Sequence, residues 1–190
     1  MSRPAVFLDR DGTIIIDKGY LCRPEEVAFE HGAIDGLRAI SSLGLPIVVV
    51  SNQSGVARGY FSSEHVDAVN RRISQLLHLQ EVDILAWYFC PHGDGDACDC
   101  RKPAPGMLVN AARQHDLDLL RSFVVGDKRC DLELATAIQA TGILVKTGKG
   151  SATAAWAKLA GIRVCANLPE VSVAIRALVR NDRRDERRPH

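Results

Sequence analysis

The chain has 190 residues, of which 46% are hydrophobic and 25% charged, and its 24 Lys and Arg against 23 Asp and Glu give a net charge of +1. This composition excludes disordered, collagen-like and coiled-coil proteins, and the balanced charge excludes a domain-wide basic field of the kind that binds nucleic acid. No apolar run approaches the ~20 residues of a membrane helix, and Asp9 interrupts the first apolar stretch too early for a signal peptide. We therefore expect a cytoplasmic protein that does not enter a membrane.

Five short apolar runs predict buried β-strands, because each is nearly continuous in aliphatic or aromatic residues. In chain order these runs are residues 5–8, 47–50, 84–89, 123–125 and 143–145.

Amphipathic patterns between these runs predict helices, since their apolar residues recur three and four apart. The helical patterns are Ala33, Leu37 and Ile40; Val66, Val69, Ile73 and Leu77; Leu108, Ala111 and Ala112; and Leu132, Ala135 and Ile138. Ser62 or Ser63 is expected to cap the second helix, and Pro105 to begin the third. Gly44 and Gly142 are expected to end the first and the fourth.

The alternation of strands and helices predicts an α/β fold, a doubly wound parallel sheet covered by helices on both faces as a three-layer structure. Ligands of such sheets bind beyond the carboxyl ends of the strands. We expect one domain over residues 1–179 with no large cap, a compact insert at residues 90–100, and a charged, disordered tail at residues 180–190. Because no sustained apolar surface pattern is evident, we also expect a monomer.

The first predicted strand ends in an acidic pair, Asp9 and Asp11, followed by Gly12. Residues two apart project to the same side of an extended chain, so the two carboxylates repel each other unless a cation lies between them. A hard divalent ion with oxygen ligands, Mg²⁺, meets that need. A solvated acidic turn is the alternative.

Polar groups follow the later strands as well. They are Ser51 and Asn52 after the second strand, Arg101 and Lys102 before the third helix, and Asp127, Lys128 and Asp131 after the fourth strand. Each alone has an ordinary explanation as a turn, cap or solvated residue. Together they supply a carboxylate nucleophile, a second carboxyl group, a hydroxyl donor, cations and a further metal ligand, which are the groups that phosphoryl transfer requires.

A separate group of soft ligands is formed by Cys90, His92, Cys98 and Cys100. Three thiolates and one imidazole are the four ligands of a closed tetrahedral zinc site, which leaves no position for a reactive water. We therefore expect structural Zn²⁺ that stiffens the loop before Arg101 and Lys102. Unrelated thiols are the alternative, because disulfides are rare in the cytosol.

The four groups of residues resemble the motifs of the haloacid dehalogenase (HAD) superfamily. Within it, the stretches FLDRDGTII, SNQSGVARGYF, CDCRKPAPGML and VVGDKRCDLELA are similar to the D-glycero-D-manno-heptose 1,7-bisphosphate phosphatase family. The resemblance implies a HAD-like Rossmann-type sheet and a phosphatase that acts on the C7 phosphate during the synthesis of activated heptose for lipopolysaccharide core. Related histidinol-phosphate phosphatases typically have an acidic residue in place of Ser54, which makes their substrate the alternative.

The resemblance also implies catalytic roles. Asp9 would be the nucleophile that forms an aspartyl phosphate, and Asp11 the general acid and base. Mg²⁺ would bind the Asp9 carboxylate, the Asp11 carbonyl and the Asp127 carboxylate, while Asp131 would orient these ligands through water.

Substrate contacts follow from the same resemblance. Ser51, the Asn52 amide and Lys102 would hold the transferred phosphate. Gln53 and Ser54 would line the sugar of a small-molecule sugar bisphosphate. The candidates for binding its second phosphate are Arg58, Arg101 and Lys128.

A function of another class stays open from the residues alone, namely a zinc-containing module that binds phosphorylated partners or nucleic acid through its Arg-rich tail. Such a binder has no need of Asp9, Asp11, Asp127 and Asp131 beside a phosphate, where their charge is unfavourable.

Overall fold

A computed structural model describes the backbone of residues 2–185, with side chains as far as residue 180. Within this part of the chain, six parallel strands form one sheet in the order β3-β2-β1-β4-β5-β6. The strands are β1 (Val6–Leu8), β2 (Ile47–Asn52), β3 (Ala86–Cys90), β4 (Phe123–Gly126), β5 (Thr141–Val145) and β6 (Arg163–Cys165). At the centre, Phe7 pairs with Val48 of β2 and Val124 of β4.

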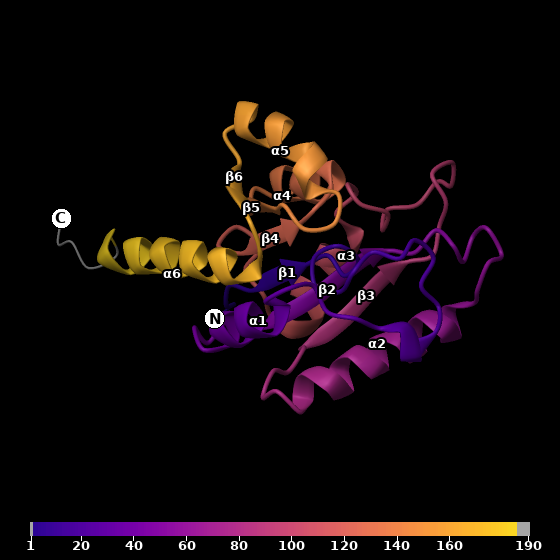
Figure 1. Ribbon diagram of the computed structural model, residues 1–190. Coiled ribbons are helices and arrows are strands. Elements are labelled where there is room, and N and C mark those ends of the chain that lie inside the picture. Colours follow the sequence, from indigo (N-terminus) through magenta and orange to yellow (C-terminus); the bar gives the residue numbers. More distant parts are fainter. Residues whose placement is uncertain (1, 186–190) are drawn as a thin grey trace.

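Helices cover both faces of the sheet, as the sequence predicted. One face carries α1 (Ala33–Ser41), α2 (Ser63–His78) and α6 (Leu168–Asp185), and the other α3 (Gly106–His115), α4 (Arg129–Ala137) and α5 (Gly150–Leu159); a short 3₁₀ turn, η1, spans Pro24–Glu26. Figure 1 shows α1 and α2 below the central strands, α4 and α5 above β4, and α6 extending to the left at the level of β1. Strand alternation explains the two layers, since Val6 and Leu8 pack with the first set and Phe7 with the second.

The prediction of an α/β fold is confirmed, and apart from the short turn η1, three elements that the sequence did not predict complete it. These are α5, β6 and α6. The strand β6 has only three residues at the sheet edge, too few for an apolar run to stand out. The helix α6 packs on the core through Leu168, Val171 and Ile175, although its last two turns are strongly charged.

Two predicted boundaries are wrong. The fourth helix ends at Ala137, and Gly142 lies inside β5 instead of ending a helix. The predicted tail begins at residue 180, whereas the helical backbone of α6 continues to Asp185. The rest of that predicted tail, residues 186–190, lies outside the described residues.

The other caps agree more closely with the sequence. Ser62 precedes α2, where its backbone N–H donates to Nδ1 of His65 over 3.2 Å. Pro105 occupies the cap position directly before α3. No separate cap domain interrupts residues 2–185, and none of the helices in that range is both long and apolar enough to cross a bilayer.

We predict that Gly36→Ala destabilises the fold by about 1–3 kcal/mol, because α1 and α6 leave no room for a methyl group. A Cβ at Gly36 would lie 2.5 Å from atoms of Leu168. Thermal or urea unfolding measures the change. Gly95→Ala is the control, since a Cβ there meets no atom within 4 Å. Equal stability of both variants would contradict the close packing of α1 on α6.

Candidate active site

Three buried carboxylates meet where β1 and β4 end. Asp9 follows β1, and its backbone N–H donates to the Val125 carbonyl over 2.9 Å, so the end of β4 fixes its position. Asp127 follows β4, and Asp131 lies in the first turn of α4. One carboxylate oxygen from each lies within 4.8 Å of the others, and all three residues are buried. Such a cluster requires compensating positive charge.

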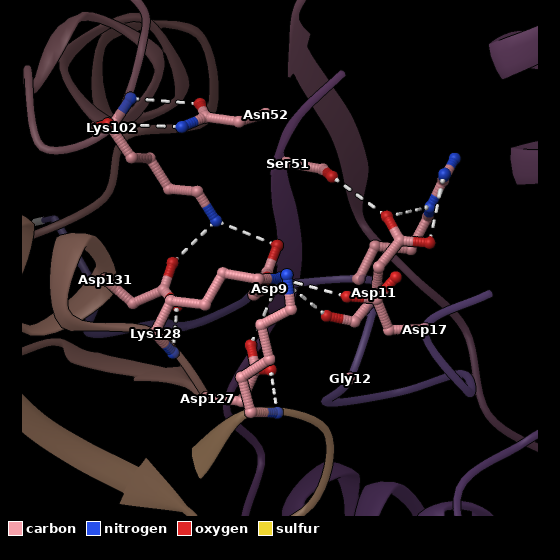
Figure 2. A network of polar contacts seen from close by, with 12 residues as sticks. Asp9, Asp11, Gly12, Asp17, Ser51, Asn52, Lys102, Asp127, Lys128 and Asp131 are labelled. Carbon is pink, nitrogen blue, oxygen red and sulfur yellow. Dashed lines mark hydrogen bonds and ion pairs between the residues drawn. The ribbon is translucent and has the colours of Figure 1, made fainter. Parts of the chain in front are cut away.

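Two lysines supply that charge (Figure 2). Nζ of Lys102 lies 2.8 Å from Oδ1 of Asp9 and 2.6 Å from Oδ1 of Asp131, and its side chain is only 2% exposed. Nζ of Lys128 lies 3.3 Å from Oδ2 of Asp9 and 3.3 Å from Oδ1 of Asp127. Each ammonium group therefore bridges two of these three carboxylates.

Burial and charge shift the carboxyl pKa values in opposite directions within this cluster. Burial alone would raise the pKa of Asp9, but the ammonium groups of Lys102 and Lys128 hold it well below its usual range. Burial, followed by the charge of Asp9, raises the pKa of Asp127 to about 7. The Asp9 carboxyl group is thus ionised at neutral pH, whereas the Asp127 carboxyl group ionises fully only when more positive charge is present.

The donor set fits a hard divalent cation. Three oxygens face one point now filled by the Lys128 ammonium group, namely Oδ2 of Asp9, the Asp11 carbonyl oxygen at 3.1 Å from Nζ and Oδ1 of Asp127. Oδ1 of Asp127 is buried and accepts no hydrogen bond, because its contact with Lys128 is an ion pair without hydrogen-bond geometry. These are the three groups predicted to bind Mg²⁺, and a cation in their midst would satisfy the oxygen that lacks a donor.

The close approach of two loops shapes this cation site. A Cβ on Gly12, whose φ is +87°, would lie 2.4 Å from Oδ2 of Asp127, so only glycine fits there. That oxygen accepts the backbone N–H of Lys149 over 2.7 Å, and Thr147 donates to the Gly12 carbonyl over 2.6 Å. The loop after β5 thereby orients Asp127.

Asp11 turns its carboxylate away from the lysines, toward the end of β2 (Figure 2). Its Oδ2 accepts Nε2 of Gln53 at 2.8 Å and Oγ of Ser51 at 3.5 Å. Arg10 donates to both carboxylate oxygens, from Nε over 3.1 Å and from Nη2 over 3.2 Å. Gln53 therefore contacts the predicted general acid and base in addition to lining the pocket.

A polar cavity of about 360 Å³ opens above these groups. Its lining includes Asp9, Asp11, Ser51, Asn52, Gln53, Ser54, Arg101, Lys102 and Lys128. All of these were predicted from the sequence. Asp127 and Asp131, which contact Lys128 and Lys102 respectively, are not part of the lining, and neither is Arg58.

Other residues of the lining were not predicted as site residues from the sequence, among them Asp17, Tyr20 and Lys149. Lys149 follows β5, a strand whose carboxyl end offered the same signal as those of β1, β2 and β4. Asp17 and Tyr20 carry no strand-end signal, because they come from the long loop between β1 and α1.

The side chain of Asn52 fixes the position of Lys102. Its Oδ1 accepts the Lys102 backbone N–H over 3.0 Å, and its Nδ2 donates to the Lys102 carbonyl over 3.1 Å. Nζ of Lys102 also donates to the Val50 carbonyl over 2.9 Å. These contacts from β2 hold the ammonium group beside Asp9.

The predicted zinc ligands lie together, and the last of them, Cys100, directly precedes Arg101 of the pocket lining. Sγ of Cys90 is 3.8 Å from Sγ of Cys98 and 3.1 Å from Sγ of Cys100, while Nδ1 of His92 is 3.3 Å from Sγ of Cys100. A tetrahedral zinc ion with Zn–S bonds of about 2.3 Å places its sulfur ligands about 3.8 Å apart. No disulfide links these four residues, so the cluster could hold a metal ion.

Arg101 and Arg58 share one carboxylate partner beside this cluster. Arg101 pairs with Asp94 and donates to the His92 carbonyl over 3.1 Å. Nη2 of Arg58 lies 3.9 Å from the other oxygen of Asp94, and its guanidinium group is 5.9 Å from the ring centre of Tyr20. Both arginines therefore lie near the pocket, with Arg58 farther out.

Comparison with known proteins places this site in a family. Residues 99–171 match the model of the HAD-hydrolase-like family. D-glycero-beta-D-manno-heptose-1,7-bisphosphate 7-phosphatase of Yersinia pestis is 41% identical over 168 residues, 82% of this chain and 89% of the relative. The chain belongs to the heptose-1,7-bisphosphate phosphatase family of the HAD superfamily.

A second relative and a solved structure support the same family. The phosphatase of the same name from Escherichia coli K12 is 41% identical over 156 residues, 78% of this chain and 82% of the relative. The crystal structure of D,D-heptose 1.7-bisphosphate phosphatase from B. bronchiseptica, complexed with magnesium and phosphate, matches with a TM-score of 0.83 and 34% identity. That match covers 90% of this chain and 97% of the other.

We predict that Mg²⁺ binds more weakly as the pH falls from about 8 to about 6. Below the pKa of about 7 the Asp127 carboxyl group holds a proton, which the cation must displace. The apparent affinity should fall by up to about tenfold per pH unit below that value. Calorimetric titration in buffers of different ionisation enthalpy measures affinity and proton release together. An affinity independent of pH with no proton release would contradict the raised pKa.

Proposed function

We propose that this protein is a Mg²⁺-dependent phosphatase that removes the C7 phosphate of D-glycero-D-manno-heptose 1,7-bisphosphate. The ionised Asp9 carboxylate at the floor of a pocket lined by cations carries this proposal. The names of the relatives support the substrate. The reaction would serve the synthesis of ADP- or GDP-heptose for lipopolysaccharide core.

In the proposed first step, a carboxylate oxygen of Asp9 attacks phosphorus and the bond to the sugar oxygen breaks. Asp11, which enters this step protonated, gives its proton to that oxygen and is left as the carboxylate that Arg10 contacts, while Asp9 becomes an aspartyl phosphate. Ser51, the Asn52 amide and Lys102 bind the phosphate oxygens. In the second step Asp11 takes a proton from a water that attacks the same phosphorus, which releases phosphate and restores Asp9.

Mg²⁺ would be held by Asp9, the Asp11 carbonyl and Asp127, where it would neutralise phosphate charge and align the phosphate with Asp9. Because the Lys128 ammonium group fills this position, it would move toward the pocket that it lines. There it would bind a substrate oxygen, the role expected of Lys128. Asp131 remains available to orient these groups through its contact with Lys102.

The Cys and His cluster would bind structural Zn²⁺ through Cys90, His92, Cys98 and Cys100. All four of its positions are taken by protein ligands, which leaves no place for a reactive water. The ion would fix Arg101 and Lys102, which follow the last ligand directly. We further propose a cytoplasmic monomer that binds neither nucleic acid nor membrane.

We predict that Asp9→Asn abolishes turnover, since an amide is a far poorer nucleophile and a weaker cation ligand. Activity on heptose bisphosphate should fall by many powers of ten. Steady-state kinetics measures the loss, and thermal melting checks the fold. Residual activity within about tenfold of the wild type would remove Asp9 from the nucleophile role.

We predict about one equivalent of Zn²⁺ in protein purified without chelators. Cys98→Ser should lower the zinc content and the melting temperature, whereas Cys22→Ser, outside the cluster, should change neither. Elemental analysis and thiol titration measure the effect. Zinc-free protein in which the three cluster thiols of Cys90, Cys98 and Cys100 all react freely would overturn the assignment.

We predict that Arg101→Ala or Arg58→Ala narrows the preference for heptose bisphosphate over an aryl phosphate. Losing a charge-assisted contact to the second phosphate should cost roughly 2–4 kcal/mol, about 30- to 1000-fold in kcat/KM, and an aryl phosphate has no second phosphate to lose. Histidinol phosphate, measured alongside, tests the alternative substrate. Equal losses on bisphosphate and aryl phosphate would assign these arginines to the transferred phosphate or to the fold.

A further inference from the structure

Arg10, between the two catalytic aspartates, is a fully buried cation outside the roles proposed so far. Its side chain is 1% exposed and is not part of the pocket lining. It continues the alternation of Val6 and Leu8 and therefore points toward α2, away from the side of Asp9. Arg10 thus cannot touch a substrate.

The guanidinium group of Arg10 contacts two residues, Asp11 and Asn70. Its Nε and Nη2 atoms donate to opposite oxygens of the Asp11 carboxylate over 3.1 and 3.2 Å. Its Nη1 atom donates to Oδ1 of Asn70 over 3.0 Å. Asn70 is 6% exposed and lies among apolar residues on the buried face of α2. A planar, five-donor group is suited to fixing the plane of a carboxylate while resting on a second acceptor.

If packing were the only role of Arg10, an apolar side chain would fill this space without the free-energy cost of burying a charge. A buried ion pair is often no more stabilising than apolar side chains of the same volume. Asp11, in contrast, must lie within hydrogen-bond distance of the leaving oxygen, and a small misplacement of such a group slows the chemical step. The buried contact therefore favours a role for Arg10 in positioning the Asp11 carboxylate.

We infer that Arg10, braced by Asn70, is a positioning residue that fixes the Asp11 carboxylate for proton transfer to the leaving group. The inference rests on the proposed acid and base role of Asp11 but on no particular sugar. Arg10 contacts the Asp11 carboxylate from the side of α2, while Ser51 and Gln53, which line the pocket, contact it from the pocket side. Helix α2 thereby becomes part of the catalytic framework without contributing a group that touches substrate.

Leaving-group dependence separates positioning from a purely structural role. A poor leaving group such as phenolate needs the proton from Asp11, whereas 2,4-dinitrophenolate departs without it. The experiment measures kcat/KM for phenyl, 4-nitrophenyl and 2,4-dinitrophenyl phosphate, since this ratio reports steps up to departure of the phenol. The variants are Arg10→Lys, which cannot span both Asp11 oxygens and Asn70, and Asn70→Ala, which removes the brace.

We expect both variants to lose about tenfold or more on phenyl phosphate and less than about threefold on 2,4-dinitrophenyl phosphate, a part of the 10²–10⁴ of general acid catalysis. Asn70→Asp, which keeps an acceptor oxygen, should recover most of the loss. Ser74→Ala, one turn along α2 where its Oγ accepts the Trp87 indole, is the control for damage to the helix. Equal losses on all three esters, or none, would overturn the inference.

Asp11→Asn in the same series distinguishes a failure of the proposed acid and base role of Asp11 from a failure of the positioning role of Arg10. If Asp11→Asn shows no leaving-group dependence, the proposed role of Asp11 fails. If Asp11→Asn shows it but neither Arg10→Lys nor Asn70→Ala does, Asp11 keeps its role and the positioning role of Arg10 is wrong. Should Arg10→Lys fail to fold, the Asn70→Ala and Asn70→Asp pair decides the question alone.

Discussion

The burial of negative charge where β1 and β4 end is the constraint on which the rest of this structure depends. Asp9, Asp127 and Asp131 lie within 4.8 Å of one another, almost without solvent. Only closely placed cations make such a cluster tolerable. Lys102 and Lys128 provide them, and the loops that carry both lysines are held by backbone and side-chain contacts to neighbouring strands. The same ion pairs therefore stabilise the folded state and set the charge of the groups that we propose to be catalytic.

The sheet delivers these charges by simple alternation. Residues that follow β1 project to opposite faces, so Asp9 meets Lys102 and Lys128 while Arg10 is buried toward α2. The cost of burying the Arg10 guanidinium group is offset only because Asp11 and Asn70 accept its hydrogen bonds. The two lysines on one face and Arg10 on the other therefore fix Asp9 and Asp11, which we propose as the nucleophile and as its acid and base partner.

Much of this could be predicted from the sequence, because strand ends are marked by abrupt changes from apolar to polar residues. That signal predicted Asp9, Ser51 and Asp127 as site residues, and the resemblance to a known family implies the roles that we propose for them. The burial of Arg10 could not be predicted, because a charged residue in a turn is normally solvated and its partner Asn70 lies sixty positions away in the sequence. Helix α6 was not predicted because its charged end obscures the apolar face in the sequence. Strand β6 was not predicted because three residues at the sheet edge are too few to form a recognisable apolar pattern.

The central claim is that Asp9, ionised by Lys102 and Lys128, carries the phosphoryl group between substrate and water. Trapping tests it most directly: the enzyme is mixed with Mg²⁺ and a phosphate ester, quenched in acid, reduced with borohydride and digested. An acyl phosphate on Asp9 is reduced to homoserine at that position, which peptide mass spectrometry identifies. We expect homoserine at position 9 only when both substrate and Mg²⁺ are present. Rapid turnover with an unmodified Asp9, or with the label on another residue, would contradict the account.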